Sequence, residues 1–310
     1  MLRSMFSGVS GLRTHQNKMD VIGNNIANVN TVGFKSGRVT FKDSIYQNIY
    51  SSSEGNDIYG GSNPSQVGYG SQVSAVSVNF GTGSYEPTGH GTDCMINGSG
   101  FFLVGPKPED DTGIPVDAVS GLNLTRVGEF TIDGDGYLVD ANKNVVYGFW
   151  GENGEVGEGT AEWNPDTTSV VRPIRLPNNQ TTPVVDDEDT ERLNLTGISI
   201  DANGVISGQT SDGTTYKFGV VAVANVTNPN ALENIGNSYY KAVSNTGDVE
   251  AFEPGSGATG ILQTGCLEMS NVDLATEFSN MITTQRGFQA CSKMITVSDE
   301  MLQELVNLKR

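Results

Sequence analysis

The stretch SNVDLATEFSNMITTQRGFQACSKMITVSDEMLQELVNLKR, from Ser270 to Arg310, decides the fold of this chain. Its apolar residues recur every seven positions in the row Leu274, Met281, Phe288, Ile295 and Leu302, with Phe278 and Val306 on the neighbouring row. Met294, Met301, Leu305 and Leu308 continue the stripe. This spacing is typical of an amphipathic helix. Ser270 lies three residues before Asp273, so a capping-box-like start is predicted there. A helix this long cannot bury its apolar face alone.

Residues 1–30 predict the partner of that helix. Met5, Leu12, Met19 and Ile26 also recur every seven positions, and Val9 and Ile22 occupy adjoining rows. Two long amphipathic helices at the two ends of one chain favour pairing as a coiled coil. A surface helix pair on an ordinary globule is the alternative, but both ends are much longer than average globular helices.

Sequence motifs at both ends resemble a known family. The segment DVIGNNIANVNTVGFK, Asp20 to Lys35, is similar to the N-terminal signature of the axial proteins of the bacterial flagellum, the rod and hook subunits. Met269 to Leu274 and Gln285 to Gln289 resemble the matching C-terminal signature, and the ending from Ser298 to Arg310 is most similar to the hook members. The motif residues are Asn24, Asn25, Ala27, Asn28, Thr31, Gly33, Phe34, Gln285 and Arg286.

The resemblance implies a structural subunit of the flagellar hook, a flexible tube that transmits torque from rod to filament around a central export channel. Its implied partners are further copies of itself, the rod, hook cap and hook–filament junction proteins, and the flagellar type III export apparatus. The chain would be exported to the extracellular hook without a cleaved signal peptide. The expected polymerisation interface is the set of helix stripes, Met5, Val9, Leu12, Met19, Ile22, Ile26, Leu274, Phe278, Met281, Phe288, Ile295, Leu302 and Leu305.

A distal rod subunit of the same family is the closest alternative. Such subunits resemble this chain but usually lack a second outer domain. The segment 150–215 and the ending Val306 to Arg310 favour the hook. A secreted β-domain adhesin or enzyme with helical ends is less favoured, because it does not account for the motifs at both ends.

The middle of the chain predicts β structure, so the expected class is α+β, mainly β. Phe130 to Leu138 and Ile198 to Ile206 each alternate apolar residues around an Asp/Asn-Gly turn, a strong hairpin signal. The expected domains are the paired helices 1–30 and 270–310, a connector 31–70, a discontinuous β domain 71–149 and 216–269, and a small inserted outer β domain 150–215.

Charge and composition exclude several classes. The net charge is −18, and residues 43–266 hold 8 basic against 29 acidic residues, which argues against nucleic-acid binding. We interpret the acidic excess as a solvated surface. The chain contains no run of 18 apolar residues, so no membrane insertion is expected. Three cysteines without a CxxC pair suggest neither a disulfide framework nor a zinc site.

Little in the sequence indicates chemistry. His90, Asp93 and Cys94 are close enough to suggest a thiol nucleophile and its base, but no oxyanion donor is identifiable. Asp133 to Gly136 and Asp201 to Gly204 resemble the start of a calcium loop, yet the position that requires Glu holds Asn142 or Thr210. We therefore expect no enzyme activity, no cofactor and no metal site.

Overall fold

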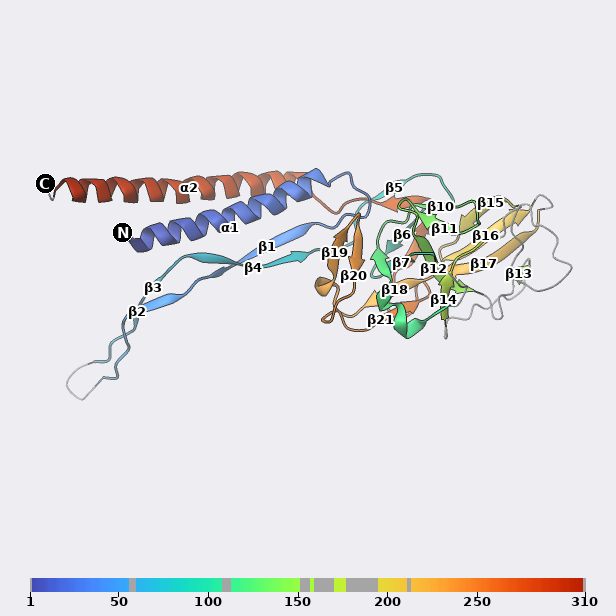
Figure 1. Cartoon of the computed structure of the whole chain (residues 1–310), viewed down its shortest axis with the longest axis horizontal. Helices are drawn as coiled ribbons and strands as arrows, with labels where there is room; N and C mark the ends of the chain where they lie inside the picture. Colours follow the sequence, from blue (N-terminus) through green and yellow to red (C-terminus); the bar gives the residue numbers. More distant parts are fainter. Residues whose placement is uncertain are drawn as a thin grey trace. The chain divides into compact units, whose positions relative to one another are not determined.

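A computed structural model describes residues 2–55, 60–107, 113–150, 157–158, 170–176, 195–210 and 213–308. The chain forms two compact units. Unit 1 comprises Met1–Val29, Ser36–Asn79 and Val272–Arg310, and unit 2 comprises Asn30–Lys35 and Phe80–Asn271. Each unit therefore draws on segments that are far apart in the sequence (Figure 1).

Unit 1 contains both helices, α1 (Leu2–Ala27) and α2 (Leu274–Asn307). The N-cap of α2 is Asp273, so the predicted start at Ser270 is corrected. Asp273 has an extended backbone, and its carboxylate accepts hydrogen bonds from the Ala275 N–H at 3.0 Å and the Thr276 hydroxyl at 2.7 Å. A short carboxylate in this conformation satisfies an amide that has no partner within the helix.

The two helices lie side by side and antiparallel (Figure 1). The hydroxyls of Ser4 and Ser298 are 3.4 Å apart, and a Cβ at Gly8 would lie 3.1 Å from Ile295. A Cβ at Gly11 would lie 2.8 Å from the Cys291 sulfur. The helices therefore meet closely at small residues, and coiled-coil pairing of the seven-residue rows stays a prediction.

A long hairpin packs on α1 within unit 1. Strand β1 (Gly37–Asp43) pairs antiparallel with β4 (Ser71–Val78), and β2 (Tyr46–Tyr50) pairs with β3 (Ser65–Gly68). The predicted boundary near Gly70 thus lies inside this hairpin, whereas the two units divide between Asn79 and Phe80. The β1 register shifts between Thr40 and Phe41. Such an irregularity breaks the period-two pattern, which explains why the sequence predicted only a partly extended connector here.

The described residues of unit 2 form β-strands and the short 3₁₀ turns Val116–Gly121 and Pro229–Ala231. Its main sheet follows the order β15-β16-β17-β12-β7-β9-β20-β19, and β5–β23 and β6–β22 form two separate pairs. The strands are β5 (Tyr85–Pro87), β6 (Cys94–Asn97), β7 (Phe101–Gly105), β8 (Ile114–Pro115), β9 (Asn123–Thr125), β10 (Phe130–Ile132), β11 (Leu138–Asp140), β12 (Val145–Trp150), β13 (Gly157–Glu158), β14 (Val170–Pro173), β15 (Leu195–Ile200), β16 (Val205–Thr210), β17 (Thr215–Val221), β18 (Val223–Val226), β19 (Glu233–Gly236), β20 (Tyr239–Lys241), β21 (Val249–Phe252), β22 (Ile261–Thr264) and β23 (Cys266–Glu268).

Apolar side chains cover both faces of this sheet. Alternate residues of a strand point to opposite faces. Phe102 and Val104 of β7 belong to one apolar cluster, whereas Phe101 and Leu103 belong to another. All five residues of β7 are buried. Unit 2 therefore holds its own core, and β7 lies at its centre.

The two predicted hairpins are confirmed. β10–β11 and β15–β16 are antiparallel pairs, with turn hydrogen bonds from the Gly136 N–H to Asp133 O and from the Gly204 N–H to Asp201 O. The Asp133 and Asp201 carboxylates also accept backbone N–H bonds within their turns. These aspartates stabilise turns, which is the ordinary role of Asp at such positions.

The range 150–215 is only partly within the described residues. Its described strands join the main sheet: β14 pairs with β12, and β16 pairs with β17. The acidic run 186–189 lies outside the described residues. A separate outer domain here stays a proposal.

Candidate assembly surface

The predicted stripe residues divide by exposure. Ile22 is buried, at 4% exposure. The residues that repeat every seven positions are mostly half-buried: Met5, Leu12, Met19, Ile26, Met281, Phe288, Ile295 and Leu302. Four residues of the set are exposed: Val9, Leu274, Phe278 and Leu305. The main rows are thus partly covered within a single chain, and other apolar residues of the helices remain uncovered.

The second half of α2 carries a separate, outward apolar face. Val297, Met301, Leu305 and Leu308 are exposed, with Leu305 at 49%. Together with Glu300 and Glu304 they line a surface depression with a volume of about 440 Å³. Their spacing of four, four and three residues is the helical period. The sequence pattern included Met301, Leu305 and Leu308 in the apolar stripe, but only Leu305 in the predicted interface.

The first half of α1 carries an exposed face with positive charges, whereas the α2 face carries the acidic residues Glu300 and Glu304. Phe6 is 64% exposed and Val9 is 39% exposed, and the exposed cations Arg3 and Arg13 flank them. Phe6, Val9 and Arg13 line a groove of about 540 Å³ whose other wall comes from the hairpin. Phe6, Arg3 and Arg13 lie outside the apolar row that repeats every seven positions, so the sequence pattern did not predict them.

Asn25 and Gly37 anchor the hairpin to α1. The Asn25 amide is 1% exposed; it donates to Gly37 O at 2.9 Å and accepts from the Gly37 N–H at 2.9 Å. The side-chain amide supplies the donor and the acceptor from two separate atoms, so it pairs with the Gly37 N–H and carbonyl together. Asn28 in turn donates to the backbone and side-chain oxygens of Asn24 at 2.9 Å. Three asparagines of the motif thus have structural partners.

Gly33 belongs to unit 2, where the chain needs a left-handed backbone. Its φ is +68°, its N–H donates to Glu268 O at 2.7 Å, and a Cβ would lie 2.9 Å from Val127. A residue with a side chain would be strained here and would meet a neighbour. This explains the glycine of the motif.

Lys35, Arg126 and Glu268 form a buried ion triad in unit 2. Lys35 Nζ lies 2.5 Å from Glu268 Oε1, and Arg126 Nη1 lies 3.4 Å from Glu268 Oε2. Lys35 also donates to Gly81 O at 2.8 Å. Burial lowers the pKa of Lys35 and of Arg126, while Glu268 acts in the opposite direction on both. The triad holds the segment after α1 against three parts of unit 2.

The remaining motif residues make no comparable cluster. Gln285 and Arg286 are exposed on α2, where Arg286 donates to Gln289 at 3.3 Å. Ala27 and Thr31 are exposed, and Phe34 is half-buried. The Phe34 N–H donates to Thr31 O at 3.3 Å, closing a turn.

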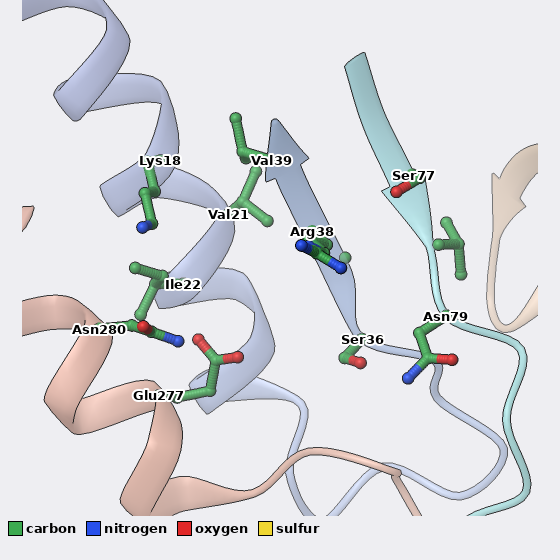
Figure 2. A pocket seen from close by; sticks show the side chains of 12 residues that line it. Lys18, Val21, Ile22, Ser36, Arg38, Val39, Ser77, Asn79, Glu277 and Asn280 are labelled. Atoms are coloured by element: carbon green, nitrogen blue, oxygen red, sulfur yellow. The ribbon is translucent and has the colours of Figure 1, made fainter. Parts of the chain in front are cut away.

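A polar cavity of about 710 Å³ lies between the helices and the hairpin of unit 1. Figure 2 shows side chains from α1, α2, β1 and β4 around it, with Glu277 pointing in from α2. Glu277 Oε2 is buried without a hydrogen-bond partner, and the cations Lys18 and Arg38 also line the cavity. In the part of the chain that the structure describes, no group of three or more His, Cys, Asp or Glu side chains is placed to hold a metal.

Cys94 is not placed to act as a nucleophile. The side chain is fully buried, and burial raises the pKa of its thiol far above the ordinary value. The neighbouring Asp93 accepts the Thr88 hydroxyl at 2.5 Å, and His90 is exposed. A reactive cysteine needs a lowered thiol pKa and access to substrate, and this site offers neither.

Neither described helix combines the length and the hydropathy that crossing a membrane requires.

Known protein families match both ends of the chain. Residues 5–35 match the family described as flagella basal body rod protein, and residues 263–308 match the C-terminal family of flagellar basal body rod FlgEFG proteins. The chain is 40% identical to the flagellar basal-body rod protein FlgG of Bacillus subtilis over 311 aligned residues, covering 100% of both chains. It is 29% identical to the flagellar hook protein FlgE of Borreliella burgdorferi over 455 aligned residues, again covering 100% of both. It is 32% identical to the FlgG protein of Buchnera aphidicola from Acyrthosiphon pisum, over 99% of this chain and 100% of that one. The chain belongs to the rod and hook family of flagellar axial proteins.

Proposed function

We propose that this chain is a structural subunit of the flagellar hook that polymerises through its terminal helices into a tube with a central export channel. The observation that carries the proposal is the uncovered apolar face of α2, where Val297, Met301, Leu305 and Leu308 are exposed. Contiguous exposed apolar residues mark interaction sites. Neighbouring subunits of a tube would cover this face.

The proposed tube bends while it transmits torque from the rod to the filament. Apolar packing between helices resists sliding, whereas the acidic and polar middle of the chain suits weak outer contacts. The proposed partners are further copies of this chain, the rod, the hook cap and hook–filament junction proteins, and the export apparatus. Export would occur without a cleaved signal peptide.

The rod is the second candidate location. The 40% identity to a protein named FlgG favours it, whereas the ending from Ser298 to Arg310, which is most similar to hook members, favours the hook. Deletion of the gene, followed by electron microscopy of isolated basal bodies, separates the two. Complete rods without hooks support the hook, and truncated rods support the rod.

Leu305→Asp tests the axial interface itself. Leu305 is 49% exposed, so the monomer should fold normally, while a carboxylate placed in a subunit contact loses its hydration. We expect the purified variant to remain unpolymerised and cells that carry it to be non-motile. Phe288→Asp is less informative, because Phe288 is half-buried in a single chain.

Gln289→Asp is the matched control for Leu305→Asp. Gln289 is exposed on the same helix and accepts a hydrogen bond from Arg286, which a carboxylate can also accept. The control should polymerise like the wild type. Normal polymerisation of Leu305→Asp would contradict the axial interface.

A further inference from the structure

Among the residues that the structure describes, no helix lies beside the last turns of α2. Ser4 lies opposite Ser298, the helices are antiparallel, and α1 begins at Leu2. Residues of α2 beyond about Glu300 therefore extend past the start of α1, as Figure 1 shows. The outward face of α2, defined as Val297, Met301, Leu305 and Leu308 with Glu300 and Glu304 at its edge, falls largely in this overhang.

The α1–hairpin groove has the complementary properties. It is lined by Phe6, Val9 and Arg13 of α1 and by Tyr69 and Val73 of the hairpin, and its volume is about 540 Å³. Its apolar residues Phe6, Val9, Tyr69 and Val73 match the apolar α2 face in kind, and Arg13 matches the acidic edge in sign. The polar residues Ser10, Thr14, Asn17, Ser71 and Gln72 complete the lining. Electrostatic complementarity of this type selects a partner and sets its register.

The charged residues of the two surfaces form no ion pairs among the described residues. In the part that the structure describes, none of Arg3, Arg13, Glu300 and Glu304 takes part in an ion pair. All four are exposed in a single chain. Lys309 and Arg310 follow this face and lie outside the described residues.

We propose that the outward face of α2 in one copy docks in the α1–hairpin groove of the next copy, with Glu304 and Glu300 facing Arg13. This inference rests on the proposed function and specifies which surfaces meet. The two surfaces differ, so the contact is heterologous, and a heterologous contact that does not close into a ring generates an open helical polymer. The occupant of the groove is a second copy of this chain.

Charge reversal tests the pairing. The critical concentration for polymerisation is measured by pelleting the purified full-length chain, with circular dichroism as the check on monomer folding. We expect Arg13→Glu and Glu304→Arg each to raise the critical concentration about tenfold or more, because like charges then face each other. The double variant Arg13→Glu/Glu304→Arg restores attraction and should return to within about threefold of the wild type.

Glu250→Arg is the matched control, since Glu250 is exposed on β21 in unit 2. It makes the same charge change as Glu304→Arg and should polymerise like the wild type. If the wild-type chain forms no polymer, the proposed function fails. If the wild type polymerises and both single reversals do so equally well, this docking is wrong while the function stands. Loss in both singles without recovery in the double would show that each surface meets something else, and it also overturns the pairing.

Discussion

At the scale of single residues, Glu268 connects four segments of unit 2. Its carboxylate accepts from Lys35, from Arg126 and from the Gly83 N–H at 2.9 Å, and its carbonyl accepts from Gly33. The side chains of Lys35 and Glu268 are fully buried. Buried charges are tolerated only when they are paired and hydrogen-bonded. The triad therefore holds these segments in one arrangement, and removal of one of its charges should destabilise unit 2.

Glu268→Gln tests the triad. The substitution keeps the shape of the side chain but leaves Lys35 and Arg126 buried without a counter-charge. Breaking a buried pair on one side costs about 3–5 kcal/mol. We expect the free energy of unfolding of unit 2 to fall by that amount, measured by urea denaturation.

The exposed pair Lys107–Asp135 supplies the control for this substitution. Its two side chains are 49% and 57% exposed, and exposed ion pairs contribute little to stability. Asp135→Asn should leave the denaturation midpoint almost unchanged. Equal effects of Glu268→Gln and Asp135→Asn would show that the buried triad has no special role in stability.

At the scale of elements, α2 depends on its first turn. Asp273 holds the end of the helix through Ala275 and Thr276, and these hydrogen bonds lower the pKa of its carboxyl. The cap is therefore complete above the ordinary pKa of Asp, about 3.9, and is lost as the pH falls through the lower folded value. Asp273→Ala removes it at every pH.

Amide exchange at the start of α2 measures this cap. In Asp273→Ala, we expect faster exchange at Ala275 and Thr276, because an N-cap acceptor protects amides that have no partner within the helix. Asp273→Asn keeps an acceptor oxygen and should retain most of the protection, without the acid dependence. Unchanged exchange in Asp273→Ala would remove Asp273 as the determinant of the helix start.

The elements that the sequence predicts well are those with local signals. Both helices followed from apolar periodicity, and the hairpins at Asp133 and Asp201 followed from their turn residues. Strand β1 was predicted only as part of a partly extended connector, because the irregularity at Thr40 and Phe41 interrupts its alternation. The pairing of β1 with β4 joins two strands that are separated by a long connection, and no local sequence pattern encodes such a pairing.

The candidate surface was predictable only in part, for a related reason. A seven-residue repeat finds the side of a helix that packs on a partner, so it found Phe288 and Ile295, which are half-buried in a single chain. Phe6 and Arg13 are exposed on another side of α1 and were not predicted. Their role becomes visible only once the helix pair shows which faces are already covered.

At the scale of the whole molecule, each unit is stabilised by its own interior. Both apolar clusters, which include Phe102 and Leu103, belong to unit 2. Unit 1 is instead held by close helix packing at Gly8 and Gly11 and by the two hydrogen bonds between Asn25 and Gly37. Units with separate interiors unfold as separate cooperative transitions when their coupling is weak.

Calorimetry of the unpolymerised chain tests this independence, and we expect two transitions. Gly11→Leu should lower only the transition temperature of unit 1. Even a Cβ at Gly11 would lie 2.8 Å from the Cys291 sulfur, so a larger side chain forces the helices apart. Glu268→Gln should lower only the transition of unit 2. Polymerisation should raise the transition of unit 1 alone, since binding stabilises the folded state that it contacts. A single transition that both substitutions shift would mean that the two units fold as one. Substitutions in the assembly surface would then also lower the stability of unit 2.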